Sequence, residues 1–362
     1  MNVIVPMLGE KFYSNADFSS PKPLIEVADK TLFEHSMGFL CGSDEVQKII
    51  FVISKEDSQN FELDSVIARS VGDKNIEVII SNEHTSGAVC TSLLAADVWQ
   101  SDDELIIFNY DQWINADIAT VLTDFRKGGL DFGAISFSSV HPKWSYVQLD
   151  DDAKVIRSAE KKPISKNAMA GFYYFKTANL FFRLASDALL SSSWDTNNFY
   201  VSELFNFAVL RELVGSVFTI EKKDYFNFYD PLEVENFRVH FEALAQIDVS
   251  KAVVYGYFRA LNSRQLQELD EIMCADVMLE EIGGVKLFGK SNVLKFVEEN
   301  LFCCEHLEFD VDSVHISGQT AFVELQLCLN SKRYKILDVI QISGDKIQKI
   351  RAFITEVCVG EV

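Results

Sequence analysis

Short apolar runs alternate with helical stretches over about the first 245 residues, and this alternation constrains the fold more than any other feature. Residues 3–7, 48–53 and 104–109 have the length and apolar character of buried strands. Residues 32–40 and 88–99 have the apolar spacing of helices. The pattern predicts an α/β fold, with a Rossmann-like, doubly wound and mostly parallel sheet that carries helices on both faces.

From about residue 248 the pattern changes to helices followed by a run of adjacent strands. The expected helices cover residues 249–261, 264–274 and 292–300, and the expected strands cover residues 307–316, 320–329, 335–343 and 347–355. Short turns between these strands predict an α+β domain with an antiparallel meander. We therefore expect two domains, residues 1–245 and 248–362, since single cores stop growing at roughly 250–300 residues.

The charge balance narrows the range of partners. The chain has 33 Lys and Arg residues against 54 Asp and Glu residues, a formal net charge of −21. Such a chain repels phosphate backbones and anionic lipid, which argues against a nucleic acid polymer or a membrane as partner but leaves a small nucleotide possible. The seven cysteines show no metal-binding or disulfide spacing, and the N-terminus does not resemble a leader peptide, so we expect a cytoplasmic protein.

Ligands of such sheets bind where parallel strands end. A lysine, Lys22, lies in the segment that follows the first expected strand. Lys22 lies between two prolines, on a stiff and extended backbone. A stiff backbone suits an ammonium group that must meet a triphosphate, because positioning is most of phosphoryl-transfer catalysis. A surface turn with a solvated lysine explains the same residues equally well.

A single carboxylate follows the apolar run that ends near residue 109. The segment there reads Asn109-Tyr110-Asp111-Gln112. A hard oxygen ligand beside triphosphate oxygens is what Mg²⁺ requires. The alternative is that Asp111 is an ordinary turn residue.

These motifs resemble, in type and order, the bacterial sugar-phosphate nucleotidyltransferases of the capsular or surface polysaccharide type. The segments PMLG (6–9) and PKPLI (21–25) match the opening of that family, but the loop GEKFYS (9–14) lacks the family's second glycine and its arginine. The resemblance implies that Lys22 and Lys11 hold the triphosphate and that Leu8 and Gly9 contact the nucleotide.

The same resemblance extends to a base-binding segment and a metal site. The segment TSGAVCT (85–91) matches the family's base-contacting stretch, which implies nucleotide contacts for Thr85, Gly87 and Asn109. An ordinary helix cap is the alternative for this segment. The resemblance assigns Mg²⁺ to Asp111, and it places Asn227 at a second metal position, where the family has an aspartate.

An acceptor site is implied by two further matches. The segment EKKP (160–163) resembles the family's Glu-Lys-x-Pro signature, and GFYYF (171–175) resembles its Gly-x-Tyr-Tyr-Phe strand. The resemblance implies that Glu160, Lys161 and Gly171 contact a phosphorylated acceptor. A solvated charge cluster remains the alternative for residues 160–162.

Residues 248–358 resemble the nuclear-transport-factor-like, or SnoaL-like, cone fold, again by the order of helices and strands. The resemblance implies an apolar pocket and dimerisation through the sheet, so we expect a homodimer. Candidate polar residues are His306, His315, Asp276 and Asp338, and none is assigned a role.

Three hypotheses follow for function. The first is a magnesium-dependent nucleotidyltransferase that joins a nucleoside triphosphate to a sugar phosphate or another small phosphorylated acceptor, for surface polysaccharide synthesis. The second is a nucleotide-binding or regulatory protein with weakened chemistry, motivated by the altered loop and by Asn227. The third places isomerase or cyclase chemistry in the C-terminal domain.

Overall fold

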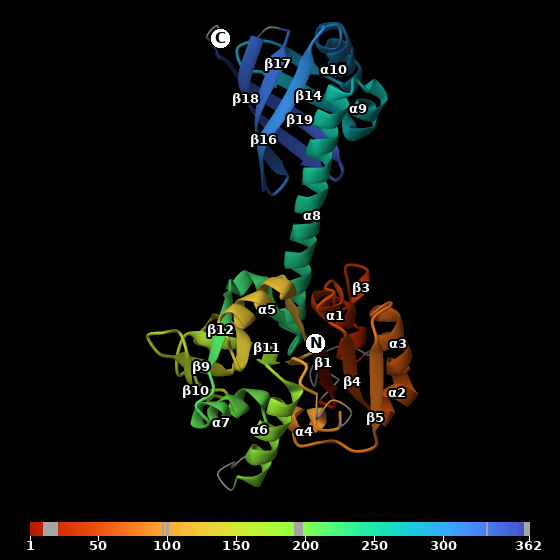
Figure 1. Cartoon of the computed structure of the whole chain (residues 1–362). Helices are drawn as coiled ribbons and strands as arrows, with labels where there is room; N and C mark the ends of the chain where they lie inside the picture. The colour runs from red at the N-terminus through yellow and green to blue at the C-terminus, as the bar shows by residue number, and fades with distance from the viewer. Residues whose placement is uncertain (10–20, 96–97, 99–100, 192–197, 331, 358–362) are drawn as a thin grey trace. The chain divides into compact units, whose positions relative to one another are not determined.

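The computed structural model describes residues 1–9, 21–95, 98, 101–191, 198–330 and 332–357 (Figure 1). The chain divides into two compact units, Met1–Phe237 and Arg238–Val362. A domain boundary near residue 245 would fall inside a single helix, α8 (Pro231–Asn262). The ranges 1–245 and 248–362 thus stay a prediction, and the two units are described separately below.

Among the described residues, the first unit is built on a nine-stranded sheet. Its strands are β1 (Asn2–Met7), β4 (Lys48–Ser54), β5 (Ile76–Ser81), β6 (Leu105–Phe108), β8 (Phe132–Ser138), β9 (Tyr146–Leu149), β10 (Val155–Ala159), β11 (Asn167–Phe175) and β12 (Gly215–Ile220). The main path runs β10-β9-β11-β6-β1-β4-β5, and β8 joins β11 to β12. β1 is parallel to β4 and β6, β4 to β5 and β8 to β12, whereas β11 is antiparallel to β6 and β8. The predicted mostly parallel sheet is confirmed.

Helices cover both faces of this sheet and give it two apolar cores. One core combines Val3 and Val5 with α1 (Leu32–Cys41), α3 (Leu63–Ser70) and α5 (Ile118–Lys127). The other combines Ile4 with α4 (Ala88–Ser92), α6 (Ala178–Leu190) and α7 (Leu204–Leu210). Successive residues of β1 therefore serve opposite layers, as the alternation of side chains along a strand requires.

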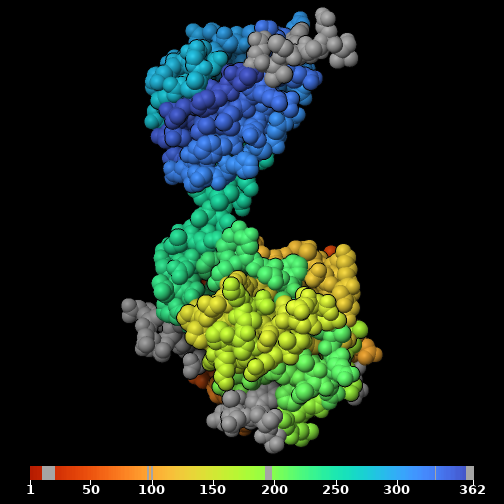
Figure 2. Space-filling model, turned by 90° about the vertical axis from the view of Figure 1, so that its left-hand side faces the viewer, coloured from red at the N-terminus to blue at the C-terminus, as the bar shows by residue number. Residues whose placement is uncertain are grey.

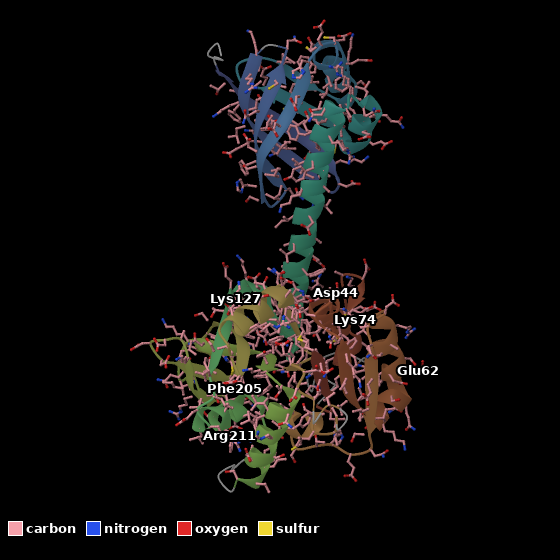
Figure 3. All side chains as sticks on the ribbon, in the orientation of Figure 1. Asp44, Glu62, Lys74, Lys127, Phe205 and Arg211 are labelled. Carbon is pink, nitrogen blue, oxygen red and sulfur yellow. The ribbon has the colours of Figure 1, made fainter. Side chains whose placement is uncertain are left out.

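The second core is largely aromatic. Phe205 of α7, labelled in Figure 3, has its ring centroid 4.7 Å from that of Phe132 and 6.2 Å from that of Phe175. All three rings are fully buried. Tilted aromatic contacts at such spacings add to the stabilisation that burial provides.

The helix expected over residues 88–99 is shorter in the structure. It ends at Ser92, and residues 96–97 and 99–100 lie outside the described part of the chain. The hydroxyls of Thr91 and Ser92 donate to the carbonyls of Gly87 and Ala88, at 3.1 and 2.8 Å. Hydroxyls that bond to carbonyls four residues earlier slightly destabilise a helix, so this segment is a weak helix former.

The second unit contains most of α8, together with α9 (Leu266–Ile272), α10 (Lys290–Val297) and a sheet. Among the described residues this sheet has six strands, in the order β15-β14-β19-β18-β17-β16. Its strands are β14 (Met273–Glu281), β15 (Lys286–Phe288), β16 (Leu307–Ser317), β17 (Thr320–Leu329), β18 (Lys332–Ser343) and β19 (Lys346–Val357). The last four strands, drawn in blue, form a broad face of this unit (Figure 2). The predicted α+β class and the antiparallel meander are confirmed.

One strand of the second unit was wrongly assigned from sequence. Residues 273–274 were expected to end a helix, whereas Met273 begins β14. β14 pairs in parallel with β19, and Met273 and Val277 are fully buried. Pairing with a strand that is distant in sequence decides this segment, and local propensity cannot show it.

Two further observations concern the whole described chain. Within residues 1–9, 21–95, 98, 101–191, 198–330 and 332–357, no helix is both long and apolar enough to cross a membrane. The six cysteines in these ranges are all unpaired.

The cap of α1 provides a test of the fold. Thr31 accepts a hydrogen bond from the Glu34 N–H at 3.1 Å, and the Thr31 N–H donates to the Glu34 carboxylate at 2.7 Å. We expect Thr31→Ala to lower the free energy of unfolding of the first unit by about 1 kcal/mol. Thr31→Ser keeps the hydroxyl and should stay close to the native value.

The measurement is urea unfolding followed by tryptophan fluorescence. All four tryptophans, residues 99, 113, 144 and 194, belong to the first unit, so their emission reports on that unit. Equal losses for the alanine and serine variants would contradict the capping role.

Candidate functional site

Two adjoining cavities open near the ends of β1, β6 and β11. The first has a volume of about 400 Å³, and we call it the aromatic cavity because Trp144, Tyr173, Tyr200 and Tyr225 line it. The second has a volume of about 350 Å³, and we call it the strand-end cavity because residues that follow β1 and β6 line it. Three residues line both cavities: Ala88, Asn109 and Tyr229.

The strand-end cavity brings together the residues predicted to bind the nucleotide. They come from the end of β1, the turn at residue 22, the start of α4 and the loop after β6. The residues are Leu8, Gly9, Lys22, Thr85, Gly87, Asn109 and Asp111. Lys11, which was predicted to accompany Lys22, lies outside the described residues.

Lys22 is held by a short and stiff turn. Pro21 is extended, with φ −61° and ψ 148°, and Lys22–Leu24 form one 3₁₀ turn. Lys22 is buried, with only 9% of its surface exposed, and it lines the cavity. This placement argues against the alternative of a solvated lysine in a surface turn.

The segment around Gly87 requires a glycine. Gly87 has a φ of +94°, and a Cβ atom there would lie 2.7 Å from the backbone nitrogen and oxygen of Phe199. The hydroxyls of Thr85 and Thr91 are 2.5 Å apart, and the Thr91 N–H donates to the Gly87 carbonyl at 3.0 Å. A side chain at position 87 would collide with the Phe199 backbone, so the glycine allows these two backbone segments to pack closely beside the cavity.

The loop that carries Asp111 is fixed by its neighbour Gln112. The Gln112 side chain is 1% exposed; its amide donates to the Gly171 carbonyl and accepts from the Gly171 N–H, both at 2.8 Å. The Asn109 N–H donates to the same Gly171 carbonyl at 2.8 Å, and the Phe228 N–H donates to the Asp111 carbonyl at 2.8 Å. These bonds hold Asp111 against the strand-end cavity.

The donor set of the strand-end cavity is compatible with Mg²⁺. Asp111 is the one carboxylate among the described residues that line it. No group of three or more His, Cys, Asp or Glu residues forms a metal cage within the described chain. Mg²⁺ commonly keeps several waters and binds through one or two carboxylates together with substrate phosphates, so a single aspartate fits.

Asn227, the second predicted metal residue, has a different placement. It is 1% exposed and lies outside the lining of both cavities. Its side-chain oxygen accepts a hydrogen bond from the Tyr229 N–H at 3.1 Å. This geometry gives Asn227 a role in shaping the turn before α8.

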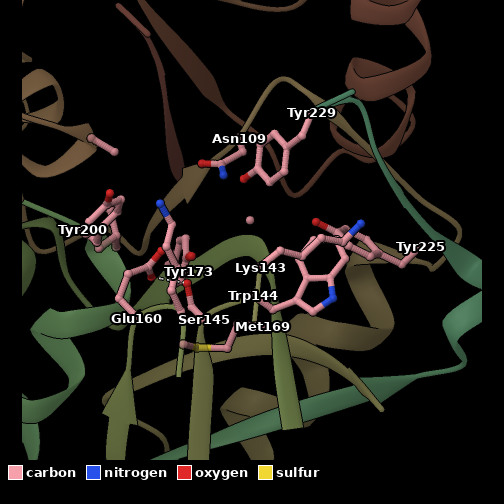
Figure 4. A pocket seen from close by; sticks show the side chains of 14 residues that line it. Asn109, Lys143, Trp144, Ser145, Glu160, Met169, Tyr173, Tyr200, Tyr225 and Tyr229 are labelled. Carbon is pink, nitrogen blue, oxygen red and sulfur yellow. Dashed lines mark hydrogen bonds between the residues drawn. The ribbon is translucent and has the colours of Figure 1, made fainter. Parts of the chain in front are cut away.

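The aromatic cavity contains the three residues predicted for an acceptor: Glu160, Lys161 and Gly171. Glu160 is labelled in Figure 4. The Glu160 carboxylate accepts hydrogen bonds from the hydroxyls of Ser145 and Ser202, the latter at 2.9 Å. Lys161 has a φ of +53°, and its Nζ lies 5.6 Å from the centroid of the Tyr200 ring. The bound carboxylate argues against a simple solvated charge cluster for Glu160, whereas Lys161 and Lys162 are themselves exposed.

A wall of rings faces these polar groups. Trp144 is 4% exposed and packs edge-on against Phe137 and Tyr225, with ring centroids 5.2 and 5.6 Å apart. Lys143 Nζ lies 4.6 Å from the Trp144 ring centroid and 2.6 Å from a Glu233 oxygen. Trp144 therefore belongs both to the core and to the cavity.

The buried tyrosines of this cavity remain protonated. Burial raises the pKa of Tyr173, and the charge of Glu160 raises it further. Burial also raises the pKa of Tyr225, with a further contribution from the charge of Asp111. Their hydroxyls can therefore act as hydrogen-bond donors.

The rings of this wall, Trp144, Tyr173, Tyr200 and Tyr225, are not among the site residues predicted from the sequence. Tyr173 lies two residues after Gly171 on β11 and so shares its face, a relation that the strand period could have shown. Ser145 and Tyr229 come from loops that are distant in sequence, and neither is among the predicted site residues. Figure 4 shows Tyr229 beside Asn109, on the side of the cavity opposite Glu160.

Comparisons with known proteins relate the first unit to one family. The sequence profile described as nucleotidyl transferase matches residues 18–205. No curated protein sequence matches the chain.

Three solved structures are similar to parts of the chain. The nucleoside-diphosphate-sugar pyrophosphorylase from Vibrio cholerae RC9 is 22% identical, covers 65% of this chain and 99% of its own, and has a TM-score of 0.56. The inositol-1-phosphate CTP transferase from T. maritima is 12% identical, covers 64% of this chain and 90% of its own, and has a TM-score of 0.50. An NTF-2-like protein from Burkholderia xenovorans LB400 is 10% identical, covers 32% of this chain and 90% of its own, and has a TM-score of 0.29. The first two share a fold with about two thirds of this chain.

Gly171 tests the geometry of the site. A Cβ atom at Gly171 would lie 2.5 Å from the Asn109 side-chain nitrogen, in a buried region. We expect Gly171→Ala to displace Asn109 and to lower the free energy of unfolding of the first unit by roughly 1–3 kcal/mol.

The matched control is Gly38→Ala. Gly38 lies in α1, and no atom comes within 4 Å of the place that a Cβ atom would take there, so alanine should be neutral or stabilising. Tryptophan fluorescence during urea unfolding measures both variants. A Gly171→Ala variant as stable as the native chain would contradict the close packing of Asn109.

Proposed function

The chain belongs to the nucleotidyl transferase family, and we propose that it joins a nucleoside triphosphate to a sugar phosphate or another small phosphorylated acceptor, with release of pyrophosphate. The observation that carries this proposal is the pair of adjoining cavities, each of which contains a lysine and a carboxylate. A transfer between two phosphates needs two such sites side by side. As the sequence resemblance implies, the product would feed surface polysaccharide synthesis.

The strand-end cavity is the proposed site of the triphosphate. Lys22 offers a positioned ammonium group, and the small residues Thr85, Gly87 and Ala88 around the start of α4 line the part of the cavity where the base would lie. In a chain with a net charge of −21, such a local cation is what makes phosphate binding favourable. Asp111 would hold Mg²⁺, which when bound supplies positive charge to the triphosphate oxygens.

The aromatic cavity is the proposed site of the acceptor. Lys161 has no carboxylate within ion-pair distance among the described residues and can bind the acceptor phosphate, whereas Lys143 is already paired with Glu233. Glu160 is oriented by two serine hydroxyls and can accept hydrogen bonds from acceptor hydroxyls. The ring of Trp144 offers an apolar surface to the rest of the acceptor.

The proposed reaction is an in-line displacement. An oxygen of the acceptor phosphate forms a bond to the α-phosphorus of the triphosphate, and the bond from that phosphorus to the bridging oxygen of the β-phosphate breaks. Pyrophosphate leaves with the electron pair. Lys22 orients the triphosphate and offsets its charge, and Asn109, which lines both cavities, lies where the two substrates would meet.

The first test concerns Lys22 and the metal. We expect Lys22→Ala to lower kcat/KM for pyrophosphate release by about 10²-fold or more, because a positioned charge on the transferring phosphate is lost. Asp111→Asn should have a similar effect and should also raise the Mg²⁺ concentration needed for half-maximal rate. EDTA should abolish release, and added Mg²⁺ should restore it.

The assay uses a panel of nucleoside triphosphates and sugar phosphates with coupled detection of pyrophosphate. Absence of turnover with every pair at high protein concentration would contradict the proposal. If a nucleotide still stabilises the chain against heat without turnover, the binding or regulatory hypothesis is favoured instead.

A second test separates the two substrates. We expect Lys161→Ala to raise the KM for the phosphorylated acceptor at least tenfold, with a smaller change in the KM for the triphosphate. Lys162→Ala is the matched control, since Lys162 is exposed and lies outside the lining of both cavities. Equal effects of the two substitutions would argue against the placement of the acceptor.

A further inference from the structure

The second unit contains a partly open cavity of about 270 Å³ between its sheet and its helices. The walls are mainly apolar side chains from α8, α10 and the strands. Leu279, Phe296, Leu327, Ile336 and Ile350 are representative. An apolar cavity of this kind suits the body of a small molecule.

A carboxyl group interrupts the apolar wall. Asp338 lies on β18 on the same face as the buried residues Ile336, Ile340 and Ile342, at a position where the strand pattern calls for an apolar side chain. Its neighbours on the adjacent strands are Val323 and Ala352. Asp338 therefore lies in the core of the unit.

The Asp338 side chain lacks a partner there. Only 6% of its surface is exposed, and its Oδ1 atom makes no hydrogen bond within the described part of the chain. Burial raises the pKa of Asp338 to about 7. A buried carboxyl group without a hydrogen bond lowers stability, and a leucine or valine in its place would avoid that penalty.

The other polar residues around the cavity do not balance this charge. Tyr257 from α8, Glu281 from the end of β14 and Tyr334 from β18 also line it. Lys, Arg and His are absent from the described lining residues. A cavity with two carboxyl groups and no cation disfavours anions and favours a positively charged group.

We propose that this cavity binds a small hydrophobic molecule that carries a protonated amine, with the amine paired to Asp338. The apolar body fills the space between the helices and the sheet. The amine supplies the hydrogen bonds and the positive charge that the protein itself does not provide. This site is separate from the proposed nucleotidyl transfer and does not depend on it.

The test measures binding of three probes to the full chain by calorimetry at pH 8, where the amine is protonated and Asp338 is mostly ionised. The probes are 2-phenylethylamine, 2-phenylethanol and 3-phenylpropanoate, which share an aromatic body and differ in the polar group. We expect the amine to bind at least tenfold more tightly than the alcohol, and the carboxylate to show no binding. Equal binding of amine and alcohol, or no binding of any probe, would overturn the proposal.

Variants then locate the site. Asp338→Asn should weaken amine binding at least tenfold and leave alcohol binding within threefold of the native value. Glu281→Gln, which removes the other carboxylate of the cavity, should weaken amine binding less than threefold. Unchanged amine binding in Asp338→Asn would overturn the assignment.

Folding of the variants is checked by thermal unfolding with circular dichroism. Because Asp338 lacks a partner, Asp338→Asn should unfold at the native temperature or above. A lower unfolding temperature would contradict the unpartnered carboxyl group, and the comparison of amine with alcohol on the native chain does not depend on any variant.

Discussion

The buried amide of Gln112 holds both cavities of the first unit in place. It bonds to the N–H and the carbonyl of Gly171, which lies in β11. β11 can offer these groups because its register with β8 shifts between Met169 and Tyr173, so that Gly171 is left out of that pairing. The same contact thus fixes the loop with Asp111 on one side and the face of Gly171 and Tyr173 on the other.

The close packing of Asn109 against Gly171 also requires that residue 171 has no side chain. Asn109 occupies the space that a Cβ atom would need, and its own N–H completes the bonds to Gly171. Since Asn109 lines both cavities, a change at this junction reaches both proposed substrates at once. The contact between Asn109 and Gly171 thus links the end of β6 (Leu105–Phe108) to the middle of β11 (Asn167–Phe175).

Much of the first unit could be predicted from sequence, because strands such as β1, β4 and β6 are contiguous apolar runs, and Gly9 and Asp111 closely follow two of them. Lys22, Gly87 and Asp111 indeed meet in one cavity. The aromatic cavity could not be predicted in the same way, because Trp144 and Tyr225 come together only through tertiary packing. For the same reason Asn227, which local alignment placed at a metal position, is found to support a turn.

In the second unit, the order of helices and strands could be predicted from the sequence. The start of β14 could not, because it depends on pairing with β19. Asp338 was visible in the sequence as a candidate without a role. Its significance depends on burial and on the absence of a nearby cation around the described cavity, and neither can be read from the chain. The cavities of the first unit thus contain lysines beside carboxylates, whereas the charged residues that line the cavity of the second unit, among the described residues, are both acidic.

Binding of a nucleoside triphosphate in the strand-end cavity can be observed in a crystal structure of the full chain with Mg²⁺ and a non-hydrolysable triphosphate analogue, chosen as the one that best stabilises the chain against heat. We expect density for the phosphates beside Lys22 and Asp111 and for the base beside Thr85 and Gly87. A nucleotide bound at another surface, or no nucleotide at saturating concentration, would contradict this expectation.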